Sequence, residues 1–229
     1  MKREELKFQY APLEYQSLLQ KIENGRLINY LRRRLHYLIR KRLNIEVMNR
    51  RNLPGHDNFV IAANHSSHLD IIALLSAMPL GKLNDCYSVA AADYFFANDL
   101  LAWLSKLLAN TLPISRSYGA YSAIKVCGTL LDNGKNLIIF PEGTRSKDGN
   151  IHEFKSGIGI LMAGRKQPVI PIYIKGAYDA LPKGRIIPLK KKIVVIIGEP
   201  LYFTDRPDDS ESWQQISREC EDAVKRLIP

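Results

Sequence analysis

Residues 64–70 contain the two residue types that most often move protons in enzymes. His65 and Asp70 lie between two apolar runs, of which 59–63 predicts a strand and 71–75 a helix. Five positions turn about 140° on a straight helix, so the two side chains do not meet if both are helical. They meet if His65 lies in the loop and Asp70 in the first helical turn. The carboxylate then orients one ring nitrogen, and the other is free to take a proton from an alcohol.

The same stretch has other interpretations. Ser67 and Asp70 have a spacing close to that of a capping box, in which Asp70 would accept only backbone N–H groups and stabilise the start of the helix. His65, His68 and Asp70 resemble metal ligands, but no further His, Cys or acidic cluster completes a site of usual spacing, so we expect no metal. The chain contains no Gly-x-Ser-x-Gly motif, which argues against a serine hydrolase.

A second polar segment, residues 140–146, follows another apolar run and carries a carboxylate, a glycine, a cation and two hydroxyl groups. Open α/β sheets bind ligands beyond the carboxyl ends of their strands, where this loop and His65 could meet. Arg145 could hold a phosphate through two hydrogen bonds. Further contacts would come from its neighbours Gly143, Thr144 and Ser146. Considered alone, the loop is more typical of a surface turn with an internal Glu–Arg pair.

Three weaker signals accompany these two segments. Arg116 follows a predicted helix and Lys155 precedes another, so each is a candidate phosphate ligand. Considered alone, Arg116 is more typical of a solvated loop arginine, and the segment at Lys155 of a helix cap. Pro171 lies in the apolar run 169–172, and its missing N–H predicts a strand at the edge of the sheet or a proline at the end of a strand.

The pattern of the remaining chain predicts the elements that position these residues. Short β-rich runs alternate with longer helical ones, which is typical of an α/β fold. Strands are predicted at 59–63, 86–90, 136–140, 169–174 and 193–197, and helices at 70–78, 98–108, 118–131, 157–165 and 210–227. We expect one domain at 53–229, with a central sheet, mostly parallel or mixed, flanked by helices.

The first 52 residues carry most of the positive charge. They contain 13 Lys and Arg and 5 Glu, and so account for +8 of the net charge of +10. Between Arg26 and Leu43, apolar residues recur at three- and four-residue spacing, which predicts a basic amphipathic helix. Arg34 and Arg42 project toward its apolar side, where their stems would have to snorkel. Such a helix suits an anionic membrane surface. A helix packed on the domain with a solvated basic face fits equally well.

The composition also bounds the partners and the compartment. Three widely spaced cysteines without CxxC spacing indicate neither a disulfide framework nor a zinc site, so we expect a reducing compartment. No run approaches the roughly 18–20 apolar residues that span a bilayer, and no signal-peptide core follows the first five residues. Nucleic acid is not expected, because no binding module accompanies the charge. We expect a peripheral protein on the cytoplasmic side of a membrane, with 1–52 as the candidate anchor.

Taken in order, the segments around His65, Arg116, Glu142 and Pro171 resemble the four sequence blocks of the glycerolipid acyltransferase family. Its best-known members are the lysophosphatidic acid (1-acylglycerol-3-phosphate) acyltransferases. Residues 64–70 contain the family's His-x4-Asp signature, and residues 140–146 match its second strong block essentially in full. The resemblance covers about residues 58–175. Residues 113–116 lack the aromatic-Ile-Asp-Arg form often seen in the family, a departure that concerns the acceptor.

The resemblance implies transfer of a fatty acyl group from a coenzyme A or acyl-carrier-protein thioester to the hydroxyl of a lysophospholipid. The expected acceptor is 1-acylglycerol-3-phosphate and the product phosphatidic acid. His65 would be the general base and Asp70 its orienting partner. The acceptor phosphate would lie among Arg116, Glu142, Gly143, Thr144 and Arg145. No cofactor, metal or covalent acyl-enzyme is expected, since the thioester is already activated. Alternatives are an acyl thioester hydrolase and a non-catalytic lipid- or nucleic-acid-binding module.

Overall fold

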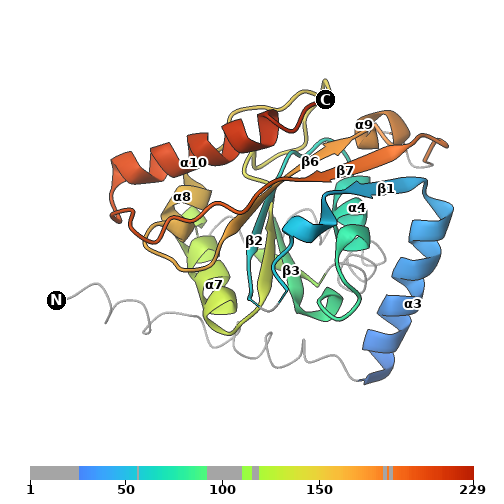
Figure 1. Cartoon of the computed structure of the whole chain (residues 1–229), viewed down its shortest axis with the longest axis horizontal. Coiled ribbons are helices and arrows are strands. Elements are labelled where there is room, and N and C mark those ends of the chain that lie inside the picture. Colours follow the sequence, from blue (N-terminus) through green and yellow to red (C-terminus); the bar gives the residue numbers. More distant parts are fainter. Residues whose placement is uncertain (1–25, 56, 92–109, 115–118, 183–184, 186–187) are drawn as a thin grey trace.

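A single mixed sheet of seven strands forms the centre of the described part of the chain (Figure 1). The structure is a computed structural model that describes residues 26–55, 57–91, 110–114, 119–182, 185 and 188–229. From edge to edge the strands are β1 (Ile45–Met48), β7 (Ile193–Ile197), β6 (Val169–Lys175), β2 (Val60–Ala63), β5 (Asn136–Ile139), β3 (Cys86–Ala91) and β4 (Thr111–Ile114). The predicted α/β class with a mixed, mostly parallel sheet is confirmed.

The direction of the strands decides where polar loops can meet. The five strands from β6 to β4 run parallel, whereas β7 is antiparallel to β6 and β1 is parallel to β7. Strand β2 lies between β6 and β5, and Ala62 is the partner of Ile139 in the β2/β5 pair. The chain therefore leaves β2 and β5 at the same end of the sheet. The loops that carry His65 and Glu142 become neighbours for this reason.

Helices cover both faces of the sheet, and β2 is buried from both sides (Figure 1). Successive residues of a strand point to opposite faces. Ile61 and Ala63 accordingly pack in the cluster that contains α4 (Leu69–Ala77) and α9 (Ala177–Ala180). Val60 and Ala62 pack in the cluster that contains α7 (Gly119–Asp132), α8 (Gly157–Met162) and α10 (Ser210–Lys225). Burial on both faces explains why β2 is a continuous apolar run.

The observed elements agree closely with those expected from the sequence. Each predicted strand or helix in the described part begins and ends within about three residues of an observed one. The predicted helix at 98–108 lies outside the described residues. Strands β1 and β4, which lie at the two edges of the sheet, were not predicted. Strand β1 precedes residue 53, so the sheet begins within the segment that the sequence analysis assigned to the N-terminal region.

Strand β6 lies inside the sheet, between β7 and β2, so of the two positions expected from Pro171, an edge strand or the end of a strand, the edge strand is wrong. The carbonyl of Pro171 accepts a hydrogen bond from the N–H of Gly198 at 2.8 Å, and therefore faces the β7 side. The antiparallel ladder with β7 ends one residue away, at the pair Ile172 and Ile197. The nitrogen of a strand residue points to the same side as its carbonyl. The missing N–H thus falls where the ladder has already ended.

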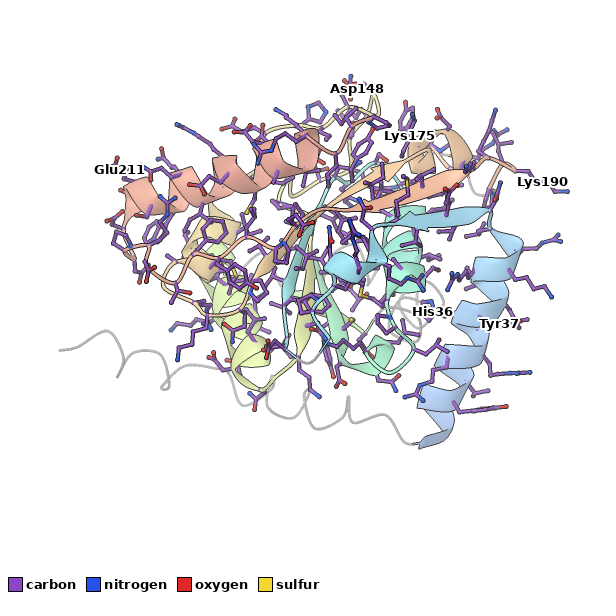
Figure 2. All side chains as sticks on the ribbon, viewed as in Figure 1. His36, Tyr37, Asp148, Lys175, Lys190 and Glu211 are labelled. Carbon is purple, nitrogen blue, oxygen red and sulfur yellow. The ribbon has the colours of Figure 1, made fainter. Side chains whose placement is uncertain are left out.

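The basic amphipathic helix expected between Arg26 and Leu43 is α3 (Arg26–Arg42), which packs against α4. His36 is buried and points toward the sheet, whereas Tyr37 points away from it (Figure 2). Four large apolar side chains are about half exposed: Tyr30, Leu31, Tyr37 and Leu38. The helix therefore packs on the domain and also keeps an apolar surface open to its surroundings.

Candidate active site

His65 and Asp70 form a hydrogen-bonded pair at the carboxyl end of β2. Nδ1 of His65 lies 2.9 Å from Oδ2 of Asp70. His65 is in the loop after β2 and Asp70 is the second residue of α4, which is the arrangement that their spacing requires. An ionised carboxylate can only accept, so Nδ1 carries the proton and Nε2 is the free base nitrogen. The imidazole is 21% exposed, so a substrate can reach it.

The carboxylate of Asp70 is fully buried and is held by the backbone as well as by His65. Oδ2 also accepts the N–H groups of Ser66 at 2.6 Å and Ser67 at 2.7 Å. Asp70 therefore combines both interpretations of the sequence: it receives backbone N–H groups beside the start of α4, and it faces His65. Three donors converge on Oδ2, whereas Oδ1 has no hydrogen-bond partner in the described part of the chain. The backbone thus fixes the carboxylate independently of His65.

The loop after β5 holds His65 by three contacts. Oε1 of Glu142 accepts the backbone N–H of His65 at 2.7 Å. The backbone N–H of Ser146 donates to the carbonyl of His65, also at 2.7 Å. The ring of Phe140 stacks on the imidazole, with 4.0 Å between ring centroids and 16° between planes. The two segments that the sequence analysis singled out therefore form one structural unit.

Glu142 lies inside this loop and is 3% exposed. Its second oxygen, Oε2, accepts the backbone N–H of His152 at 3.2 Å. Burial raises the pKa of the Glu142 carboxyl, and the hydrogen bonds from His65 and His152 oppose that rise. Both oxygens of the side chain are therefore engaged by backbone N–H groups of two separate segments.

Of the other expected phosphate ligands, Gly143, Thr144 and Arg145 lie on the solvent-accessible outer side of the loop, and Arg116 lies outside the described residues. Gly143 has a φ of +71°, a conformation that favours glycine, and a Cβ at this position would come 2.8 Å from Nζ of Lys155. The ammonium of Lys155 thus lies against the main chain of Gly143. Thr144 is exposed and Arg145 half-buried. Arg116 is not among the described residues, so its predicted place at the site stays a prediction.

His68 connects this loop electrostatically with the start of α4. It is solvent-accessible, yet the surrounding protein removes enough water to lower its pKa to about 4. The positive charge of Arg145 and that of protonated His65 act in the same direction. His68 is therefore neutral at neutral pH.

The rest of the loop, residues 146–152, is closed by hydrogen bonds around Asp148. Oγ of Ser146 donates to Oδ1 of Asp148 at 2.7 Å, and Asn150 donates to the same carboxylate through its backbone and its side chain. These bonds lower the pKa of Asp148. Nε2 of His152 lies 3.2 Å from the same Oδ1. The hydroxyl of Ser146, a candidate phosphate donor in the sequence, is buried and donates to Asp148 instead.

Two residues at the site had no role in the sequence analysis, Asn64 and Phe140. The side chain of Asn64 donates to the carbonyl of Ile174 at 3.0 Å and accepts its N–H at 2.7 Å, as a strand backbone would. Asn64 thereby fixes the point at which the chain leaves the sheet before His65. A polar residue directly after a buried strand was a signal for this role. Phe140 carried no such signal, because an apolar residue at a strand end is also typical of the core.

The described residues contain no group of three or more His, Cys, Asp or Glu side chains arranged to hold a metal ion. The three cysteines are buried and not disulfide-bonded, and burial raises the pKa of Cys86 and of Cys127 to about 12. None of the helices in the described ranges has both the length and the apolar character needed to cross a bilayer.

The central sheet thus carries a His/Asp pair at the end of β2 and a polar loop at the end of its neighbour β5, an arrangement suited to general-base catalysis. The chain belongs to the acyltransferase family. The sequence model of this family, described as Acyltransferase, matches residues 44–175. The family resemblance expected from the sequence blocks is thereby confirmed.

Individual relatives narrow the comparison. The chain is 31% identical over 189 residues to the chloroplastic 1-acyl-sn-glycerol-3-phosphate acyltransferase BAT2 of Brassica napus. The alignment covers 77% of this chain and 53% of the relative. It is also 31% identical over 172 residues to the 1-acyl-sn-glycerol-3-phosphate acyltransferase of Bacillus subtilis. That alignment covers 75% of this chain and 80% of the relative. The chain thus spans about half the length of the plant relative.

Among solved structures, the chain is similar in fold to the 1-acyl-sn-glycerophosphate (LPA) acyltransferase PlsC from Thermotoga maritima. The TM-score is 0.62, and the alignment covers 97% of this chain and 86% of that chain, at 24% sequence identity. The similarity supports the same fold across nearly the whole length compared.

Proposed function

We propose that this protein is an O-acyltransferase that moves a fatty acyl group from a thioester donor to the free hydroxyl of 1-acylglycerol-3-phosphate and so gives phosphatidic acid. The observation that carries the proposal is the His65/Asp70 pair, which leaves Nε2 of an accessible imidazole free at the end of a central strand. Relatives that bear the name of this activity support the choice of acceptor.

The proposed chemistry needs one base and no covalent enzyme intermediate. Nε2 of His65 takes the proton of the acceptor hydroxyl as its oxygen attacks the thioester carbonyl carbon. Asp70 stabilises the imidazolium through the Nδ1–H bond. The carbon–sulfur bond then breaks, and the leaving thiolate takes the proton from Nε2. The products are the new ester and the free thiol, and His65 is again neutral.

The acceptor phosphate is placed against the outer side of the loop after β5. Arg145 supplies a planar cation that suits a phosphate, and the exposed Thr144 supplies a hydroxyl. Gly143 lets the phosphate approach the main chain, and the Lys155 ammonium lies against the same glycine. In the described part of the chain, no hydrogen bond or ion pair engages that ammonium. Arg116 is proposed as a further ligand from its sequence block alone.

A panel of acceptors crossed with donors tests this function. Lysophosphatidate, other lysophospholipids and glycerol 3-phosphate are offered with acyl-coenzyme A or with acyl-carrier protein, and ester and free fatty acid are both measured. We expect ester formation with lysophosphatidate that His65→Ala abolishes and His68→Ala largely retains. Free fatty acid released without an acceptor would identify a thioester hydrolase instead. Wild-type turnover in His65→Ala would remove His65 from the mechanism.

We also propose that α3 attaches the protein to one face of an anionic membrane. The lysophospholipid acceptor would lie in that membrane. Tyr30, Tyr37 and Leu38 are exposed on the helix, and Arg34 and Lys41 lie three or four positions from them on the same side. This combination of apolar and basic side chains suits the headgroup boundary of a bilayer. A candidate anchor that packs on the domain would hold the active site close to its lipid.

Vesicle binding tests the attachment. Each cation near an anionic surface contributes about 1 kcal/mol, so Arg34→Gln together with Lys41→Gln should weaken binding to phosphatidylglycerol vesicles about 30-fold. Lys190→Gln together with Lys191→Gln is the control, because both lysines are exposed and lie outside α3. Binding that neither the double substitution nor high salt reduces would contradict the proposal.

A further inference from the structure

We infer that Glu142 is a positioning residue that fixes His65, and that it does not contact the acceptor phosphate. The kinetic part of this inference rests on the proposed function. Glu142 lies in the sequence block in which the family resemblance places the acceptor site, so the two roles make different predictions for the same side chain.

Burial and charge separate Glu142 from the acceptor. The side chain is 3% exposed, and its oxygens already accept the N–H groups of His65 and His152 at 2.7 Å and 3.2 Å. A phosphate monoester at neutral pH is mostly a dianion, which offers no donor to a carboxylate. A phosphate beside Glu142 would therefore be repelled by its charge and would find no hydrogen bond to make. The cation Arg145 and the exposed Thr144 are on the same loop and suit a phosphate better.

The contacts of Glu142 lead directly to the proposed base. Its Oε1 fixes the N–H of His65, while Ser146 fixes the carbonyl of the same residue, so the backbone of His65 is held on both sides. Phe140 fixes the plane of the ring and Asp70 fixes Nδ1. The direction of Nε2 is then fully determined by the protein. Displacement of a reacting group by about 1 Å can reduce a rate about 100-fold, so contacts that hold the imidazole in place should raise kcat.

Glu142 also joins two distant segments. His65 follows β2, whereas His152 lies at the return of the loop after β5, and one carboxylate accepts an N–H from each. Two acceptors on one side chain are required, which a carboxylate supplies and an amide does not. In Glu142→Gln the amide oxygen can satisfy one backbone N–H, and its NH2 group then faces the other.

Steady-state kinetics distinguish the two roles. We expect Glu142→Gln to lower kcat about 10- to 100-fold while the KM for lysophosphatidate stays within about twofold. Glu142→Asp keeps two acceptor oxygens and should regain part of kcat, and it replaces Glu142→Gln if that variant does not fold. Glu153→Gln is the matched control, because Glu153 is exposed on the same loop. A raised KM for lysophosphatidate with unchanged kcat, or wild-type kinetics, would overturn the inference.

A second measurement needs no activity. The chain has five histidines, so isotope-labelled histidine gives a small set of imidazole signals, and His65→Ala identifies that of His65. Without substrate, Glu142→Gln should move the His65 signal and Glu153→Gln should leave it in place. An unmoved signal would overturn the inference even if activity falls. A moved signal in a protein that acylates no lysophospholipid would uphold the positioning role and reject the proposed function.

Discussion

Replacement of Asp70 by Asn is expected to lower kcat only about 5- to 30-fold, because the backbone decides which way the amide faces. Oδ2 of Asp70 accepts N–H groups from Ser66 and Ser67 as well as Nδ1–H of His65. An Asn that places its oxygen there keeps all three bonds. Its NH2 group then occupies the position of Oδ1, which has no partner in the described part of the chain. The correct tautomer of His65 is preserved, and only the negative charge is lost.

The magnitude follows from two competing terms. A flipped Asn would leave two buried backbone donors unsatisfied, at about 1–3 kcal/mol each, so the flip is disfavoured by roughly 2–6 kcal/mol. Loss of the charge turns a hydrogen bond worth about 1.5–3 kcal/mol into one worth about 0.5–1.5 kcal/mol. The difference of about 1–2 kcal/mol corresponds to the 5- to 30-fold loss. In a Ser-His-Asp triad, by contrast, Asn at the corresponding place gives the wrong tautomer and costs about 10⁴-fold.

Turnover of lysophosphatidate with saturating acyl donor measures the effect. Asp179→Asn is the control, since Asp179 is an exposed aspartate in the first turn of another helix. Asp70→Ala should be far less active and less stable by roughly 2–6 kcal/mol, because the N–H groups of Ser66 and Ser67 lose their acceptor. An Asp70→Asn variant as inactive as His65→Ala would refute the reasoning that the backbone holds the amide.

Three further expectations concern stability and reactivity. A Cβ on Gly159 would overlap the carbonyl oxygen of Trp213, so Gly159→Ala should lower the Tm by at least about 4 °C, whereas Gly157→Ala, with nothing within 4 Å, should not. The pKa of His68 is about 4 in the folded protein, against an ordinary value of 6.5, so the unfolded state binds more protons between these pH values and stability falls as the pH drops through this window. His68→Asn should therefore reduce the difference between the thermal midpoints measured at pH 7 and pH 5. An unchanged difference would contradict this expectation. The buried thiol of Cys127 should react with a disulfide reagent only as fast as the protein opens, so rapid labelling of the native protein would speak against this environment.

The local geometry of the site could be predicted from the sequence, whereas the contacts between distant segments could not. The apolar runs on either side of His65 and Asp70 defined a strand, a loop and a helix, and the geometry of the pair follows from where the helix begins. That β5 lies beside β2 is a property of the sheet, which no local pattern encodes. The bond from His65 to Glu142 could not be predicted for this reason, and a glutamate is in any case rarely expected to be buried.

Pro171 shows the same limit from the opposite direction. Its residue type correctly excludes a full ladder on one side, and the inference of an edge strand followed from that rule. The ladder with β7 ends at Ile172, so the rule is satisfied inside the sheet. Where a partner strand ends depends on the register between segments about 25 residues apart. Local chemistry limits such arrangements without selecting one of them.

The contact between His65 and Glu142 also has a consequence for the order of folding. The two residues are 77 positions apart and meet only after β2 and β5 have paired in register. Pairing over such a distance is slow, because the intervening chain must be ordered before the contact forms. Helices α7 and α10 need no such pairing to begin forming. During refolding, helical circular dichroism should therefore return before enzymatic turnover, and turnover should report the closure of the sheet.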